Sequence, residues 1–187
     1  MRFIPWYTDD AVRQISLEIN EIKNLTGKRP FVFEFGAGAS TLYYLMKGCV
    51  VYSVESDSNY AEKVIAIAEV LGVAHRLTLC LAEERYAEYY QPTDDRPIDI
   101  VAIDGDDRVA CINSVFDSYF LPRIILIDNA NRRTVAPAVS QFGKNYVLTE
   151  YKQTFNTELG LTTPDILGNS LREPWSTVIA KLRSGET

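Results

Sequence analysis

The chain has 187 residues, a formal net charge of −6 and a sequence pI of about 4.9. This length suits one domain with a single core. The acidic balance repels nucleic-acid phosphates, and no basic cluster longer than Arg132-Arg133 offsets it, so no nucleic-acid partner is expected. No apolar run approaches the roughly 20 residues that span a bilayer, and the first residues do not resemble a secretory signal. We therefore expect a cytoplasmic protein with no membrane partner, and the sequence leaves a homodimer open.

The few cysteine and histidine residues limit the kinds of site this chain can build. Cys49, Cys80 and Cys111 are far apart and odd in number, so we interpret them as reduced core residues and not as a disulfide or zinc framework. His75 is the single histidine. A histidine metal site or a Ser-His-Asp triad needs further partners, so neither is expected.

Helical and strand-like segments alternate from Thr8 to Asp128. The first helical pattern has Thr8 or Asp9 as its expected N-cap, and the break at Gly27–Pro30 ends it. The expected helices span residues 8–25, 40–47, 59–71 and 108–120. The expected strands span residues 31–35, 49–54, 76–81, 98–103 and 124–127.

This alternation, with strands apolar on both faces, is typical of an α/β fold with a parallel sheet covered by helices on each side. After Asp128 two further strand-like runs, 146–151 and 176–182, have no good helix between them. They suit an antiparallel hairpin at one edge of the sheet. The long loop between them, residues 152–174, is of a length that usually serves a function or is disordered.

The strongest local signal is the run Glu34–Thr41, with the sequence EFGAGAST, between a strand and a helix. Gly36 and Gly38 permit a tight turn and a close approach of a ligand to the backbone. Ser40 and Thr41 can cap the next helix, whose first amides favour a carboxylate or phosphate. The turn indicates a nucleotide-like ligand.

Acidic residues follow the other strands of the expected sheet. Glu55 lies about 20 residues beyond the first glycine, where a carboxylate can bind both hydroxyls of a ribose. Asp104-Gly105 ends the fourth strand, and Asp128-Asn129 ends the fifth. The carboxyl ends of parallel strands are where open α/β sheets bind ligands, so these residues predict one site.

NAD-dependent dehydrogenases share the glycine turn and the distal acid, but two departures point away from a dinucleotide. Thr41 stands at the third glycine of G-x-G-x-x-G, and Glu34 precedes the turn by two positions. A carboxylate beside a dianionic pyrophosphate is unfavourable, whereas a ligand with a cationic amine and a sulfonium would tolerate it.

At these residues the chain resembles the class I S-adenosylmethionine (SAM)-dependent methyltransferases. Glu34–Thr41 is similar to their first motif, an acid followed by G-x-G-x-S, and Val54–Asp57 resembles their ribose-binding strand end. Ile103–Cys111 is similar to the fourth-strand motif of a group of small bacterial methyltransferases, and Trp6–Thr8 resembles the opening of that group. The resemblance covers about Trp6 to Asn129, and the last two strands more weakly.

The resemblance implies a Rossmann-like, doubly wound, mostly parallel seven-stranded sheet with helices on both faces. The final strand would insert antiparallel beside the fifth. It also implies a single SAM-binding, methyltransferase-like domain over residues 1–187, with an N-terminal helix within 1–27 and a substrate-side loop at 152–174.

Residues matched by position would hold the cofactor, S-adenosyl-L-methionine. Gly36 to Gly38 would line its methionine part, Glu55 its ribose, and Ala82-Glu83 its adenine, while Asp104 would face the methionine amine or the acceptor. Nearby Tyr86, Tyr89 and Tyr90 fit packing better than stacking on a base. The full cofactor-binding set is Glu34, Gly36, Ala37, Gly38, Ser40, Thr41, Glu55, Ser56, Ala82, Glu83, Asp104 and Gly105.

A finer resemblance concerns metal. Asp104, Asp128 and Asn129 match the positions at which magnesium-dependent O-methyltransferases of the catechol and caffeoyl-CoA type carry their ligands, and oxygen donors suit a hard cation. Those enzymes have a lysine three residues after the first ligand, where this chain has Asp107. Magnesium is therefore an alternative that the sequence does not favour.

The implied reaction is SAM-dependent methylation of oxygen or nitrogen on a small-molecule acceptor, by in-line displacement. Asp104 or Asp106 is the expected catalytic base. Two alternatives stay open: a non-catalytic protein that binds SAM or a partner, and, less favoured, an NAD-dependent oxidoreductase.

Overall fold

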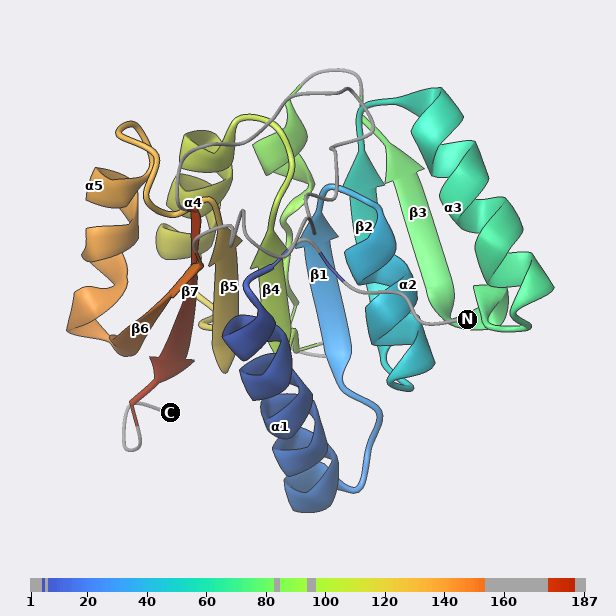
Figure 1. Cartoon of the computed structure of the whole chain (residues 1–187), viewed down its shortest axis with the longest axis horizontal. Helices are drawn as coiled ribbons and strands as arrows, with labels where there is room; N and C mark the ends of the chain where they lie inside the picture. The colour runs from blue at the N-terminus through green and yellow to red at the C-terminus, as the bar shows by residue number, and fades with distance from the viewer. Residues whose placement is uncertain (1–4, 6, 83–84, 94–96, 154–174, 184–187) are drawn as a thin grey trace, which may run out of the picture.

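The computed structural model describes residues 5, 7–82, 85–93, 97–153 and 175–183. Its described strands form one seven-stranded sheet in the order β3-β2-β1-β4-β5-β7-β6 (Figure 1). All neighbouring pairs from β3 to β5 are parallel, and β7 runs antiparallel to both β5 and β6. The strands are β1 Phe31–Phe35, β2 Val50–Glu55, β3 Leu77–Leu81, β4 Ile100–Ile103, β5 Ile124–Asp128, β6 Tyr146–Gln153 and β7 Trp175–Leu182.

Helices cover both faces of this sheet and bury two separate apolar clusters. The first face carries α1, α2 and α3, and α1 and α2 lie in front of the sheet in Figure 1. The second face carries α4, α5 and the 3₁₀ turn after β3. The α-helices are α1 Asp9–Thr26, α2 Ala39–Met46, α3 Ser58–Val70, α4 Arg108–Phe116 and α5 Ala136–Val139. The 3₁₀ turns are Ala74–Arg76, Tyr86–Tyr89 and Ser140–Lys144.

The expected fold class is confirmed, including the antiparallel last strand between β5 and β6. The central strands β4 and β5 are buried at every position, as their unbroken apolar runs predict. Within the described residues, no helix is long and apolar enough to cross a membrane.

Two local predictions differ from the structure. The helix expected over 108–120 stops at Phe116, because the backbone turns at Asp117 and the Ser118 hydroxyl takes the amide of Phe120 instead. The short helix α5 was not expected, since its four residues are too few to show a period. Thr8 does hold the N-cap position of α1, but its hydroxyl makes no capping bond.

Three predicted features lie outside the described residues. They are Trp6, Glu83 and most of the expected substrate-side loop, residues 154–174.

The turn after β1 is set by a close approach to the end of β4. Gly36 adopts φ +97°, a left-handed conformation that suits glycine. A Cβ at Gly36 would lie 2.8 Å from the nitrogen and 2.9 Å from the Cα of Gly105. The Gly36 amide also donates to the carbonyl of Val54 at 2.8 Å. Gly36 is therefore required by the chain's own backbone. The tight turn expected from the sequence is confirmed, and its close approach to Gly105 was not expected.

Substitution Gly36→Ala should destabilise the protein by about 2–4 kcal/mol, because left-handed strain adds to the clash with Gly105. Gly27→Ala is the matched control. Gly27 has φ +64° with nothing within 4 Å of its added Cβ, so it should cost only the strain, about 1–2 kcal/mol. Urea unfolding measures both free energies, and equal losses would contradict the clash.

Candidate functional site

The strand ends that carry the predicted residues meet at one edge of the sheet, where the arrows of β1 and β2 end in Figure 1. Glu55, the last residue of β2, joins two of these ends. Its Oε2 accepts the Ala37 amide at 2.9 Å, and its Oε1 accepts the amides of Ser56 and Asp57 at 2.8 and 2.9 Å. The carboxylate is thus fixed beside the glycine turn.

Glu34 is fully buried beneath the start of α2. Its Oε2 accepts hydrogen bonds from the hydroxyls of Thr41 and Ser53. Its Oε1 is buried without a well-aligned hydrogen bond from any described residue, although the Ser40 hydroxyl is close enough to lower the pKa. Burial outweighs these hydroxyls and raises the pKa of Glu34 to about 7.

Thr41 caps the N-terminus of α2. The Gly38 amide donates to Thr41 Oγ1 at 2.8 Å, and the same hydroxyl donates to Glu34. The expected capping role is therefore confirmed for Thr41, while Ser40 lies inside the first turn and is buried. Tyr60 packs over Gly38, with its hydroxyl 3.4 Å from the position a Cβ would take.

Arg108 organises the residues after β4. Its Nη2 donates to Asp104 Oδ1 at 2.8 Å, to the Asp104 carbonyl at 2.8 Å and to Asn129 Oδ1 at 3.4 Å. Its Nη1 donates to the Gly105 carbonyl at 2.9 Å. Both side chains of the ion pair are largely buried, with 12% of Arg108 and 23% of Asp104 exposed.

Asp128 lies beside Asp104 and is tied to β7. Thr177 Oγ1 donates to Asp128 Oδ1 at 2.9 Å, and the Thr8 amide donates to Thr177 Oγ1 at 3.1 Å. Burial, with the negative charge of Asp104 second, raises the pKa of Asp128 to about 8. Burial also raises the pKa of Asp104, against the opposing charge of Arg108. The pair therefore favours one shared proton.

Asp106 is an exposed carboxylate at the site. The Ser56 hydroxyl approaches its Oδ2 at 3.4 Å, which links the ends of β2 and β4. Asp107 adopts φ +45° and caps α4 by accepting the Ala110 amide at 3.3 Å. Both neighbouring aspartates are exposed, but Asp107 accepts the amide that caps α4, whereas Asp106 reaches the end of β2.

Tyr86 packs against the residues at the ends of β2 and β4. Its hydroxyl donates to the Val54 carbonyl at 2.7 Å, and its ring lies against Gly105. Tyr90 packs on the rings of Phe33 and Phe35. The packing interpretation of these two tyrosines is confirmed.

The structure brings the predicted residues of β1, β2 and β4 together and adds three that the sequence argument missed. Arg108 pairs with Asp104 four residues before it, but Asp104 lies outside α4, so helical spacing did not predict this pair. Tyr7 lies near Glu34 and Asp104, and Thr177 reaches the site from β7. Neither had a local sequence signal.

Two further predicted sets remain. Ala82 is buried directly after β3, and its amide donates to the Glu55 carbonyl at 2.8 Å, so its role beside an adenine stays a prediction. Asp104, Asp128 and Asn129 do come together, but the guanidinium of Arg108 lies against them. The described residues hold no group of three or more histidine, cysteine, aspartate or glutamate side chains able to bind a metal ion. These residues do not fit a magnesium site while Arg108 is present.

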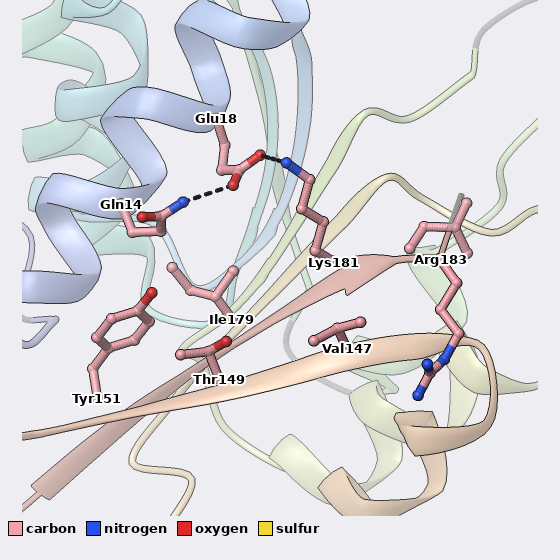
Figure 2. Close-up of a pocket in the computed structure, with 9 residues that line it drawn as sticks. Gln14, Glu18, Val147, Thr149, Tyr151, Ile179, Lys181 and Arg183 are labelled. Atoms are coloured by element: carbon pink, nitrogen blue, oxygen red, sulfur yellow. Dashed lines mark hydrogen bonds and ion pairs between the residues drawn. The ribbon is translucent and has the colours of Figure 1, made fainter.

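A groove of about 580 Å³ lies elsewhere, between α1 and the strands β6 and β7 (Figure 2). Glu18 of α1 reaches Lys181 of β7 across it at 2.9 Å. Its lining residues are Gln14, Glu18, Val147, Thr149, Tyr151, Ile179, Lys181, Leu182 and Arg183. It shares no residue with the strand-end site.

By sequence, no protein-family model and no curated protein matches the chain. By structure, it is similar to an O-methyltransferase from Bacillus cereus in complex with SAH (14% identity, TM-score 0.62, 91% of this chain and 81% of that one). It is also similar to the C-terminal domain of precorrin-6Y C5,15-methyltransferase from Rhodobacter capsulatus (12% identity, TM-score 0.60, 97% and 94%). A third match is the O-methyltransferase TomG from Streptomyces achromogenes, involved in tomaymycin synthesis, in complex with SAM (13% identity, TM-score 0.59, 91% and 80%). The chain has the fold of SAM-dependent methyltransferases.

The raised pKa of Glu34 predicts a pH-dependent stability of the unliganded protein. The group titrates near 4.5 when unfolded and at about 7 when folded, so the folded protein holds the extra proton between these values. Its stabilising effect is complete below pH 4.5 and is lost as the pH rises through 7, by up to about 3 kcal/mol. Urea unfolding across this range should show the loss in the wild type and a flatter profile in Glu34→Gln. Parallel profiles would contradict the assignment.

Proposed function

We propose that the chain binds SAM across the ends of β1, β2 and β4 and transfers its methyl group to oxygen or nitrogen of a small-molecule acceptor. One observation carries the proposal: Glu55 is hydrogen-bonded to the glycine turn at Ala37. A carboxylate that could bind a ribose therefore lies beside the turn after β1, next to the point between β1 and β4 where the strand order reverses. The shared fold supports it.

The residues present fit this cofactor. A carboxylate offers about four acceptor sites, and Glu55 uses three on backbone amides, which leaves capacity on Oε2 for a ribose hydroxyl. Glu34 Oε1 is a buried acceptor in need of a donor, and the SAM ammonium has such donors. A cation there would also lower the pKa of Glu34 and restore its charge.

SAM supplies an activated methyl group when bound, and the chain's own residues would align the acceptor with it. Asp106 is the carboxylate we assign to accept a proton from the acceptor, because it is exposed and, unlike Asp107, does not cap α4. Asp104 is less suited to this role, since its carboxylate is held by Arg108 at 2.8 Å.

A second candidate is a protein that binds SAM without turnover. The ion pair of Asp104 with Arg108 favours it, because this pairing occupies the more buried of the two carboxylates expected as a base. The two candidates share the cofactor site and differ in whether methylated product forms.

Titration calorimetry should detect SAM binding to the wild type, and Glu55→Gln should weaken it by at least about tenfold. The reason is the loss of a charge-assisted hydrogen bond, which contributes about 1.5–3 kcal/mol. Glu21→Gln on α1 makes the same charge change at a 51% exposed side chain and should bind as the wild type does. No binding of SAM at high micromolar concentration would refute the proposal. Binding of NAD in place of SAM would support the alternative of an NAD-dependent oxidoreductase.

Turnover is tested with SAM and a panel of phenols, sugars and amines, with methylated product detected by mass spectrometry. On an accepted substrate, Asp106→Asn should lower kcat by about 10²-fold or more, since a general base typically contributes 10²–10⁴-fold. Asp107→Asn is the matched neighbour and should leave kcat nearly unchanged, because asparagine also caps helices and tolerates φ +45°. Product from neither variant nor wild type, despite SAM binding, would favour the second candidate.

A further inference from the structure

Arg108 lies where its own helix disfavours a positive charge. It is the first residue of α4, and the N-terminus of a helix carries a partial positive charge. The guanidinium is nevertheless largely buried there, with 12% of the side chain exposed. Neighbouring oxygen atoms must therefore compensate for the burial of this cation.

Four oxygen atoms provide this compensation. Two are the carbonyls of Asp104 and Gly105, and two are the side-chain oxygens of Asp104 and Asn129, at 2.8–3.4 Å. Asp128 adds a further carboxyl beside Asp104. Carbonyl, amide and carboxylate oxygens are also the donors that bind hard divalent cations.

The backbone is bent on both sides of this cluster. Asp107 and Asn129 are two of the three described residues other than glycine with positive φ, at 45° and 51°. Asp107 is the N-cap of α4, and the next side chain, Arg108, reaches back to the carbonyls of Asp104 and Gly105. Asn129 directly follows β5. Aspartate and asparagine adopt this conformation more readily than other residues with a side chain, so both bends are formed by suitable residues.

We propose that the Arg108 guanidinium is a built-in cation that fills the oxygen-lined position between the ends of β4 and β5, in place of a divalent metal ion. Its charge excludes metal, and its removal converts Asp104, Asp128 and Asn129 into a divalent-cation site. Any acceptor at this edge is then oriented by hydrogen bonds from the protein and not by chelation.

The test is the binding of Mn²⁺, followed by the loss of its free electron paramagnetic resonance signal, with no SAM present. Arg108→Ala should bind one Mn²⁺ ion per chain. Any binding by the wild type at this position should be at least about tenfold weaker. Adding Asp104→Asn to Arg108→Ala should abolish that binding, because the site then loses one of its two carboxylates.

Two control variants separate charge from packing. Arg108→Lys keeps the positive charge and should exclude Mn²⁺ as the wild type does. Arg123→Ala removes another arginine paired with an aspartate, Asp99 at 3.6 Å, but uncovers a single carboxylate and should bind no ion. If Arg108→Ala does not fold, as judged by its thermal transition, the neutral Arg108→Gln takes its place.

Wild-type protein that binds one Mn²⁺ at the Asp104 position as tightly as Arg108→Ala does would overturn the proposal. So would a folded neutral variant at residue 108 that binds none. Because the measurement uses no SAM, it stands or fails apart from the proposed function. Where methyl transfer is observed, a metal chelator should leave the wild-type rate unchanged.

Discussion

The close packing of the ends of β1, β2 and β4 depends on Gly36. Its amide is bonded to the carbonyl of Val54 on β2, and its Cα faces the backbone of Gly105 after β4 with no room for a side chain. The ring of Tyr86 packs against Gly105, and its hydroxyl donates to the same Val54 carbonyl. The ends of three strands can thus approach each other closely enough to place Glu55 beside the glycine turn. The rest of the candidate site depends on this approach, because its functional groups come from those strand ends.

The second constraint is electrostatic. Glu34, Asp104 and Asp128 are carboxyl groups whose pKa values are raised by burial, and they lie within one region of the sheet edge. Hydroxyls of Thr41, Ser53 and Thr177 satisfy part of their hydrogen-bonding capacity. Arg108 supplies positive charge at Asp104. No positively charged side chain is among the hydrogen-bond partners of Glu34 in the described residues, and our proposal assigns that place to the SAM ammonium.

The sequence predicted much of this fold because its signals are local. Alternating apolar runs and helical periods located most of the elements to within one or two residues, whereas α5 is too short to show a period. The acids Glu55, Asp104 and Asp128 could be assigned to one edge because parallel strands necessarily bring their carboxyl ends to the same side. The position of β7 between β5 and β6 came from the family resemblance, since no local pattern states which edge a final strand joins.

The sequence by itself therefore determined the α/β class, the glycine turn and the row of polar residues at the strand ends. Only the tertiary structure decided how those residues are paired. Thr177 donates to Asp128 from 49 positions away, and Tyr7 is close enough to Glu34 to interact with its charge. Both placements depend on how α1 and β7 pack on the sheet. It also placed Arg108 between Asp104 and Asn129, where ligand positions were expected. The physical reason is that periodicity records which face of an element is buried, while the partner of a buried charge depends on which elements meet around it.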